Sequence, residues 1–225
     1  MKILQSIILL LFVSFALNAQ KTYDFNKFDE IIASGNVDVI LRQGETCGVE
    51  VFPNDNEEHN IKIHVNEGIL KINLLKSLVR GACENVSVIV TFDKLRRIKA
   101  YAGAEVEGQN VIRGDKLTLR LNSGATMVLD VEVDDLEVVV SEGSELEING
   151  TTKSMDVRTS SGGILEAFDL QSDYTYVTSN TGGEAEVVAK KRIEAKANTG
   201  GRVEYKGKPE ETRISDFLTG TVKRI

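Results

Sequence analysis

The sequence has few of the residues that build disulfide scaffolds or metal clusters. Its 225 residues include 2 Cys, 2 His and no Trp, which is too few thiol and imidazole ligands for either kind of framework. Lys and Arg number 27 against 34 Asp and Glu, a formal charge of −7, and this acidic balance argues against nucleic acid as a partner. Hydrophobic residues still make up 41% of the chain. The chain can therefore bury a core, and its length suits a single domain.

Long apolar runs are also absent, except for one at the N-terminus. Lys2 supplies a positive charge, Ile7 to Leu17 is almost wholly apolar, and Ala19 is a small residue at a suitable cleavage point. The run is shorter than the roughly 20 residues that span a membrane, and a buried core helix is the alternative. We predict that residues 1–19 are a signal peptide, without a lipid anchor or a later membrane span. The mature chain, 20–225, is then exported to the periplasm, the outer-membrane surface or the medium.

Export gives the two cysteines a possible role. Oxidising compartments permit disulfides, and Cys47 and Cys83 lie 36 positions apart. A bridge between them and two separately buried thiols are both compatible with the sequence. Neither cysteine has a nearby histidine that would suggest a catalytic thiolate.

From residue 96 onward the sequence repeats every nineteen residues. Two columns of mostly apolar residues recur at that spacing: Ile98, Leu117, Leu136, Met155, Tyr174, Ile193 and Thr212, then Ala100, Leu119, Val138, Val157, Tyr176, Ala195 and Ile214. The columns lie two positions apart, as expected for the buried face of a strand, whose side chains alternate between faces. The sequence therefore predicts one strand per repeat.

A polar corner and a second strand follow each of these strands. The corners contain Gly preceded by Ser, Asn, Glu or Thr, and Gly permits the positive φ of a sharp turn. We expect a polar ladder at this corner, formed by Asn122, Ser141, Ser160, Ser179 and Asn198. The second strand is predicted to bury Val106, Met127, Leu146, Leu165, Ala185 and Val203.

Two all-β architectures could use this pattern. An array of antiparallel hairpins needs a tight turn at both ends of every strand, whereas a solenoid stacks equivalent positions of successive coils. The constant period favours the solenoid. We predict a single domain over 20–225 that forms a right-handed parallel β-helix, with regular coils over 96–225.

Residues 20–95 are predicted to be an irregular β-rich part that lies outside the register of the ladder. Residues 61–72 are typical of a hairpin, and Val86, Val88 and Val90 predict another strand. Because bare strand edges invite aggregation, we expect this part to cap one end of the solenoid. Phe217-Leu218 interrupts the polar corner column and is expected to seal the other end.

These features resemble a known family. Phe28 to Gly44, with Ser34-Gly35-Asn36-Val37-Asp38-Val39, is similar to the opening of the putative auto-transporter adhesin head GIN domain family. Leu95–Gly108 and the later Ser-Gly and Asn-Thr-Gly-Gly corners are similar to its repeated corners. The resemblance covers about 27–222 and implies a secreted or surface β-helix, frequent in Bacteroidetes-like bacteria. It implies no particular functional residues.

Catalytic and metal-binding patterns are weak in this sequence. Glu147 and Glu166 would lie one coil apart, close enough for a retaining glycosidase pair, but outward glutamates at solvated turns are common. Asp134-Asp135 is the acidic pair that a polysaccharide lyase would need beside a base, and neighbouring coils do not repeat it. His59 and His64 have no third ligand in view. We therefore expect no catalytic residues, metal or cofactor, with a polysaccharide-acting enzyme as the remote alternative.

An outward row offers the best candidates for binding. It reads Tyr101, Arg120, Val139, Arg158, Val177, Lys196 and Ser215. A flat face with spaced cations could bind an anionic or extended polymer, and we predict Arg120, Arg158 and Lys196 as binding residues. The alternative is that these charges only keep the sheet soluble. Two functions follow: a binding module for a glycan or an envelope protein, or a structural protein of envelope assembly. The oligomeric state stays open.

Overall fold

The computed structural model describes residues 21–25, 27–52, 61–74 and 86–225. The predicted signal peptide, His59 and Cys83 lie outside these residues. Every regular element in the described part is a strand. The strands are β1 (Lys21–Asp24), β2 (Glu30–Ser34), β3 (Val37–Gln43), β4 (Gly48–Phe52), β5 (Ile61–Asn66), β6 (Ile69–Leu74), β7 (Val86–Phe92), β8 (Arg97–Tyr101), β9 (Glu105–Gly108), β10 (Ile112–Asn122), β11 (Thr126–Ser141), β12 (Glu145–Ser160), β13 (Ile164–Glu166), β14 (Leu170–Asn180), β15 (Glu184–Val188), β16 (Arg192–Asn198), β17 (Arg202–Lys206), β18 (Glu211–Phe217) and β19 (Thr221–Arg224).

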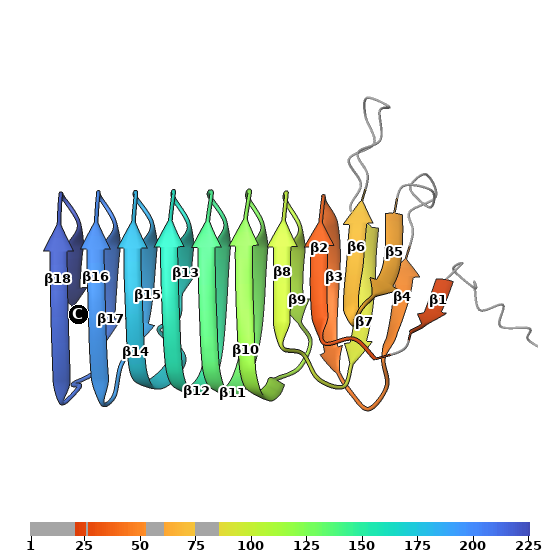
Figure 1. Cartoon of the computed structure of the whole chain (residues 1–225), viewed down its shortest axis with the longest axis horizontal. Helices are drawn as coiled ribbons and strands as arrows, with labels where there is room; N and C mark the ends of the chain where they lie inside the picture. The colour runs from red at the N-terminus through yellow and green to blue at the C-terminus, as the bar shows by residue number, and fades with distance from the viewer. Residues whose placement is uncertain (1–20, 26, 53–60, 75–85) are drawn as a thin grey trace, which may run out of the picture.

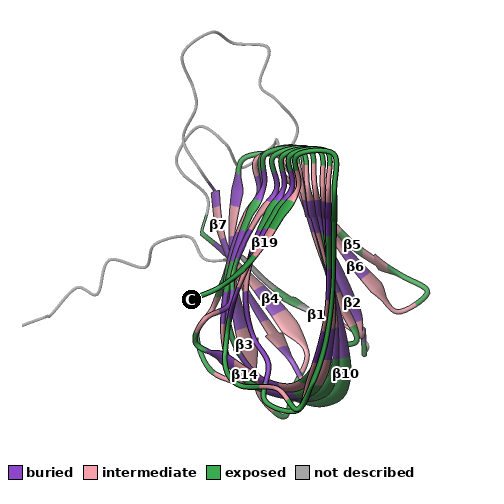
Figure 2. Cartoon of the chain, turned by 90° about the vertical axis from the view of Figure 1, so that its left-hand side faces the viewer, coloured by how far each residue is buried: buried purple, intermediate pink, exposed green. Residues whose placement is uncertain are grey.

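From β8 onward the strands stack in parallel as a solenoid (Figure 1). Each coil runs up one wall, makes a sharp turn, runs down the second wall and returns through a wider turn (Figure 2). Leu117 pairs with Leu136, and Leu136 pairs with Met155, both steps of nineteen residues. The predicted parallel β-helix of about nineteen residues per coil is confirmed.

The core lies between the two walls. One wall contributes a fully or almost fully buried column of Ile98, Leu119, Val138, Val157, Val177 and Ala195. The other contributes the predicted column of Val106, Met127, Leu146, Leu165, Ala185 and Val203. Fully burying such an aliphatic side chain contributes about 1.5–3 kcal/mol. The stacked columns therefore stabilise each coil through its neighbours.

The length of a coil is not constant, and this changes the predicted columns. Ile98 pairs with Leu119, a step of 21, and Met155 pairs with Thr175, a step of 20. Thr175 then pairs with Ile193, a step of 18. The prediction that Tyr174 and Tyr176 point inward is therefore wrong. An insertion of one residue moves a strand to its opposite face, so Thr175 and Val177 occupy the buried positions.

The variation in coil length lies wholly in the wide turns. Across the sharp turn, the inward residues of the two walls are always eight positions apart, as in Leu119 and Met127, Val138 and Leu146, Val157 and Leu165, and Val177 and Ala185. Across the wide turn the distance is eleven positions from Met127 to Val138, twelve from Leu165 to Val177 and ten from Ala185 to Ala195. The sharp turn is thus the constant part of the repeat.

The sharp turns place two consecutive residues at positive φ, as in type I′ turns. Serine and glycine do so at Ser123 (56°) and Gly124 (73°), and threonine and glycine at Thr181 (50°) and Gly182 (70°). In the last coil Leu218 (44°) and Thr219 (64°) adopt positive φ without a glycine. The turn conformation is therefore kept even where the sequence does not favour it.

The N-terminal strands enter the solenoid out of sequence order. Strand β2 pairs in parallel with both β6 and β8, and β3 pairs in parallel with β7 and β9. Ile31 therefore aligns with Ile98, in register with the column beyond it. The prediction that residues 20–95 lie outside the register is wrong for β2, β3, β6 and β7. The predicted hairpin is confirmed as β5–β6, and the predicted strand as β7.

The two ends of the solenoid differ. At the N-terminal end β5 pairs antiparallel with β6, β4 with β7 and β1 with β4, so antiparallel strands cover the last parallel coil. At the other end all seven residues of β18 are exposed. Phe217 is 64% exposed and Leu218 is 61% exposed, so the expectation that they seal the core is wrong. Among the described strands, β18 pairs only with β16, so no coil covers these two side chains.

Candidate functional site

The three predicted binding residues lie on one row of the first wall. Arg120 aligns with Val139, Val139 with Arg158, Arg158 with Thr178 and Thr178 with Lys196. All three cations are exposed. Lys99, rather than the predicted Tyr101, is the neighbour of Arg120, and Thr178 replaces the predicted Val177. The structure therefore brings the three residues together, while their binding role stays a prediction.

Each cation of this basic row (Arg120, Arg158 and Lys196) has an acidic neighbour. The ion pairs are Arg120 Nη2 to Glu137 Oε1 at 3.4 Å, Arg158 Nη2 to Asp156 Oδ2 at 3.1 Å and Lys196 Nζ to Glu194 Oε1 at 3.2 Å. The hydrogen bond from Lys196 lowers the pKa of Glu194. Such exposed pairs contribute little to stability. Their effect is to balance the charge of the wall.

A polar ladder lies beside the basic row at the sharp turn. It consists of Ser141, Ser160, Asn180 and Asn198, and Asn198 Nδ2 donates to Asn180 Oδ1 at 2.9 Å. The prediction that Ser179 belongs to this ladder is wrong. The one-residue insertion turns Ser179 into the core, where its hydroxyl donates to the Gly183 carbonyl at 2.6 Å.

The second wall carries an acidic row instead. Four glutamates stack in register, namely Glu147, Glu166, Glu186 and Glu204. Burial raises the pKa of Glu186, and the charges of Glu166 and Glu204 raise it further. Glu147 and Glu166 lie one coil apart, as the glycosidase alternative requires. A general acid and a nucleophile need different environments, however, and Glu147 and Glu166 are both exposed on the same outward row.

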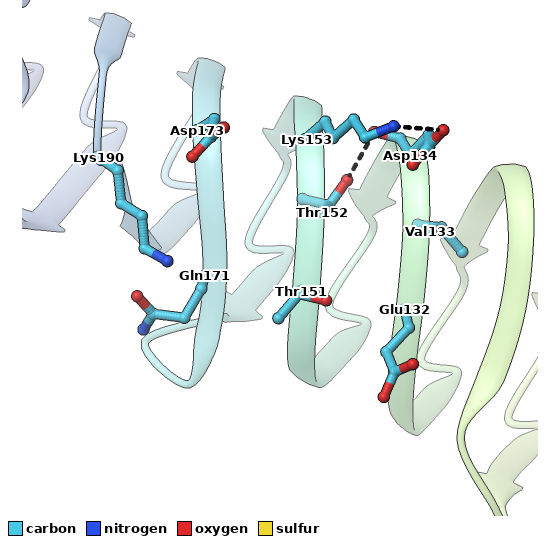
Figure 3. Close-up of a pocket in the computed structure, with 9 residues that line it drawn as sticks. All are labelled: Glu132, Val133, Asp134, Thr151, Thr152, Lys153, Gln171, Asp173 and Lys190. Atoms are coloured by element: carbon cyan, nitrogen blue, oxygen red, sulfur yellow. Dashed lines mark hydrogen bonds and ion pairs between the residues drawn. The ribbon is translucent and has the colours of Figure 1, made fainter.

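A polar groove of about 330 Å³ crosses four successive wide turns, the last of which supplies Lys190 (Figure 3). Its lining residues are Glu132, Val133, Asp134, Thr151, Thr152, Lys153, Gln171, Asp173 and Lys190. Asp134 of the predicted acidic pair lies here, and its Oδ2 forms an ion pair with Lys153 Nζ at 2.8 Å. No repeated pattern in the sequence indicates this groove, because the wide turns vary in length and composition.

The remaining candidates are dispersed. His64 is exposed on β5, opposite Lys71. Within the described ranges, no group of three or more His, Cys, Asp and Glu residues could hold a metal ion. Cys47 is half-buried and packs against the core. Because Cys83 lies outside the described residues, the disulfide stays a prediction.

Comparison with known proteins identifies relatives over most of the chain. A family profile described as "Putative auto-transporter adhesin, head GIN domain" matches residues 27–209. No curated protein matches the chain. In the described part, no helix has both the length and the apolar character needed to cross a bilayer.

Solved structures share this fold. A putative adhesin from Bacteroides fragilis superposes with a TM-score of 0.84 at 20% identity, covering 92% of this chain and 96% of its own. A putative adhesin from Parabacteroides distasonis gives 0.73 at 23% identity, with the same two coverages of 92% and 96%. A putative lipid binding protein from the same species gives 0.71 at 16% identity, again covering 92% and 96%. At these identities the likeness establishes the fold alone.

Proposed function

This chain belongs to the putative auto-transporter adhesin, head GIN domain family, and from that premise we propose that it is an exported, non-catalytic binding module. Its ligand is an extended acidic glycan that lies along the first wall, across the coils. The supporting observation is the basic row, in which Arg120, Arg158 and Lys196 share one line of a continuous parallel sheet. A rigid sheet positions such groups with little loss of conformational entropy on binding.

The spacing of the basic row narrows the class of glycan. Neighbouring coils lie about 4.8 Å apart, so cations on every second coil recur about every 10 Å. The intervening Val139 and Thr178 are uncharged. Each cation also keeps an acidic neighbour, which disfavours a densely charged polymer. A polysaccharide in which an acidic sugar alternates with a neutral one therefore fits better than an acidic homopolymer.

Retention on immobilised polysaccharides tests this proposal. The purified protein is applied to hyaluronan, whose acidic and neutral sugars alternate, to polygalacturonate and to dextran, and released sugar ends are measured in parallel. We expect preferential retention on hyaluronan that weakens with added salt, since these exposed charges are screened, and no released ends. No retention on either acidic polymer would exclude the acidic glycan, and released ends would indicate an enzyme.

A matched pair of triple variants assigns the binding to the row. Arg120→Ala, Arg158→Ala and Lys196→Ala together should abolish retention. The control triple Arg202→Ala, Lys206→Ala and Lys223→Ala removes the same charge from the second wall and should leave retention unchanged. Equal losses in the two triples would show that net charge, and not the row, governs binding.

The exposed C-terminal coil favours a second candidate function, in envelope assembly. Four of the eight exposed large hydrophobic residues in the described part lie there: Ile214, Phe217, Leu218 and Ile225. The open edge of β18 could pair with the same edge of a second copy. Asp216 continues the inward column of Ala197, and such an inward charge opposes unlimited pairing. A two-copy assembly therefore fits this end better than a filament.

Sedimentation of the protein tests this second function. The double variant Phe217→Ser and Leu218→Ser should convert a dimer to a monomer, because it removes apolar area from the end. Val128→Ser is the control, since Val128 is 44% exposed on the second wall, away from the end. A wild-type protein that is monomeric at all concentrations would contradict the assembly function.

A further inference from the structure

We propose that the polar groove at the wide turns is a second binding site, and that it takes a short uncharged oligosaccharide. The groove is lined by residues of β11, β12 and β14 and the turn after β15 (Figure 3), whereas the basic row lies on the flat wall. This inference does not depend on the proposed binding of an acidic glycan by the basic row. It rests on the shape, the hydrogen-bonding groups and the charge balance of the groove.

The shape of the groove follows from the register of three coils. Val133 aligns with Thr152, and Thr152 with Ser172, which gives a buried floor. Glu132, Thr151 and Gln171 align in the same way along one rim. Asp134, Lys153 and Asp173 form the other rim, and Lys190 lies at the end (Figure 3). The groove thus runs along the solenoid axis and crosses one coil after another.

Changes in coil length end the groove on one side. The wide turn before Val177 has one residue more than its predecessor, and the next wide turn has two residues fewer, twelve positions against ten. Lys190 belongs to that shorter turn, where its backbone N–H donates to the Ser172 carbonyl at 2.9 Å. Connections of variable length on a rigid scaffold are common positions for binding sites.

Ion pairs hold the acceptors of the groove in place. Lys153 Nζ lies 2.8 Å from Asp134 Oδ2, and Lys191 Nζ lies 2.7 Å from Asp173 Oδ2. Arg113 Nε lies 2.9 Å from Glu132 Oε2. A carboxylate that is already oriented retains free lone pairs, so it can accept from a sugar hydroxyl at a smaller entropic cost.

The groove also provides hydrogen-bonding groups that have no partner in the protein. Within the described residues, the Thr151 hydroxyl, the Gln171 amide and the Lys190 ammonium have no hydrogen bond or ion pair. Together they supply donors of three kinds, and the hydroxyl and amide also accept. A ligand with many hydroxyl groups can use both the donors and the fixed acceptors.

The charge balance indicates an uncharged ligand. Three carboxylates, those of Glu132, Asp134 and Asp173, face Lys153 and Lys190 in the groove, and Arg113 and Lys191 pair with them from outside. The three carboxylates would repel an anionic ligand, and a cationic ligand would compete with Lys153, Lys191 and Arg113 for them. A neutral ligand can accept from the Lys190 ammonium without disturbing these pairs. The floor of Val133 and Thr152 is almost wholly buried, so the groove offers a ligand mainly the hydrogen-bonding groups of its rims.

Amide chemical shifts of the full protein test the site. Cellotetraose, maltotetraose and mannotetraose are each titrated to millimolar concentration. We expect at least one to shift the amides of Thr151, Gln171 and Lys190, with little change along the basic row. If none of the three shifts these amides, or if the shifts lie elsewhere, the proposal is overturned.

Variants that spare the ion pairs separate binding from folding. Thr151→Val with Gln171→Ala removes two hydrogen-bonding groups and should raise the Kd about tenfold or more. Thr126→Val makes the same exchange on the second wall and should change nothing. An unchanged Kd in the double variant would contradict the site.

The same variants distinguish this proposal from the first. The double variant should keep its retention on hyaluronan, while the triple variant of the basic row should keep its tetrasaccharide shifts. Loss of both activities in both variants would mean that the groove is not an independent site.

Discussion

Glu30 is the buried carboxylate that ties an N-terminal strand to the regular coils. It is only 7% exposed, and its two oxygens lie 2.6 Å from Lys99 Nζ and 2.8 Å from Arg97 Nη1. Burial alone would raise its pKa, but hydrogen bonds and charges from Lys99 and Arg97 outweigh this and lower it. Because Glu30 lies on β2 and its partners on β8, the two ion pairs join residues that are 67 and 69 positions apart in the sequence.

We expect Glu30→Gln to lower the free energy of unfolding by about 1–3 kcal/mol at neutral pH, since a neutral amide replaces the carboxylate that two cations share. A lowered pKa in the folded state gives stability that is present above the ordinary glutamate value of 4.5 and is lost as the pH falls through the lowered value. Urea unfolding at neutral and acidic pH measures both effects. Asp29→Asn, which breaks the exposed pair with Arg96, should cost less. Equal losses would show that the burial of Glu30 adds nothing.

Glu186 has the opposite pH dependence. Burial and the charges of Glu166 and Glu204 raise its pKa. The folded state therefore binds a proton more tightly than the unfolded state, and the free energy of unfolding falls as the pH rises from the ordinary pKa of 4.5 through the raised one. Glu186→Gln should therefore raise the unfolding free energy at neutral pH by a few tenths of a kcal/mol. Glu184→Gln is the control, because Glu184 aligns with Ile164 and Arg202. A stability gain in the control alone would contradict this account of the acidic row.

At the scale of the single coil, two glycines in sequence have different roles in the sharp turn. Gly162 has a φ of 74° and open space around its missing side chain. Gly163 follows the turn, and a Cβ there would overlap the carbonyl of Val140 in the preceding coil. One glycine is needed for its conformation and the other for the close approach of two backbones.

We expect Gly162→Ala to cost about 1–2 kcal/mol of unfolding free energy, the strain of a left-handed alanine. Gly163→Ala should cost more, because the overlap involves backbone that cannot turn away. Thermal unfolding of the two variants, compared at the wild-type melting temperature, gives the ranking. The reverse order would mean that the coils separate easily, which would weaken the argument for a rigid binding wall.

The same elements show which parts of the coil the sequence could predict. The sharp turns keep an eight-residue spacing, so the second-wall column from Val106 to Val203 was predicted correctly. The wide turns vary from ten to thirteen positions, the longest from Val106 to Leu119. One extra residue before Tyr174 reversed the predicted faces of Tyr174 and Tyr176, because strand side chains alternate. The polar groove lies in these same turns and so left no periodic signal.

At the scale of the whole molecule, a search for sequential repeats could not predict that the N-terminal strands stack out of sequence order. Strand β2 pairs with β8 at a separation of 67 residues, as Glu30 with Arg97, and β6 lies on its other side. A constant period in the sequence indicates which strands stack on one another only when consecutive coils of the chain are also neighbours in the solenoid. The regular coils beyond β8 meet that condition, and the N-terminal coils do not. Pairing β2 with β8 also closes a loop of 67 residues, which costs more conformational entropy than closing one coil of the regular part.

Because the coils interact mainly with their neighbours, one of them can be removed as a unit. Deleting residues 126–144 joins Ala125 to Glu145, which aligns with the deleted Thr126, so the register of both walls is kept. In a solenoid the stability is approximately a sum over coils and their interfaces. We therefore expect a shortened protein that folds with a strand-rich circular dichroism spectrum and a lower melting temperature.

Deleting residues 126–143 instead removes one residue fewer and shifts every later residue of the joined coil by one position. Its outward charges would then point into the core, and we expect aggregation or no cooperative unfolding.

The first deletion, of residues 126–144, also places Arg120 directly beside Arg158, since Val139 between them is lost. Added salt should therefore stabilise this variant more than the wild type, because it screens the new repulsion. If both deletions fold equally well, the stacking register does not determine the fold.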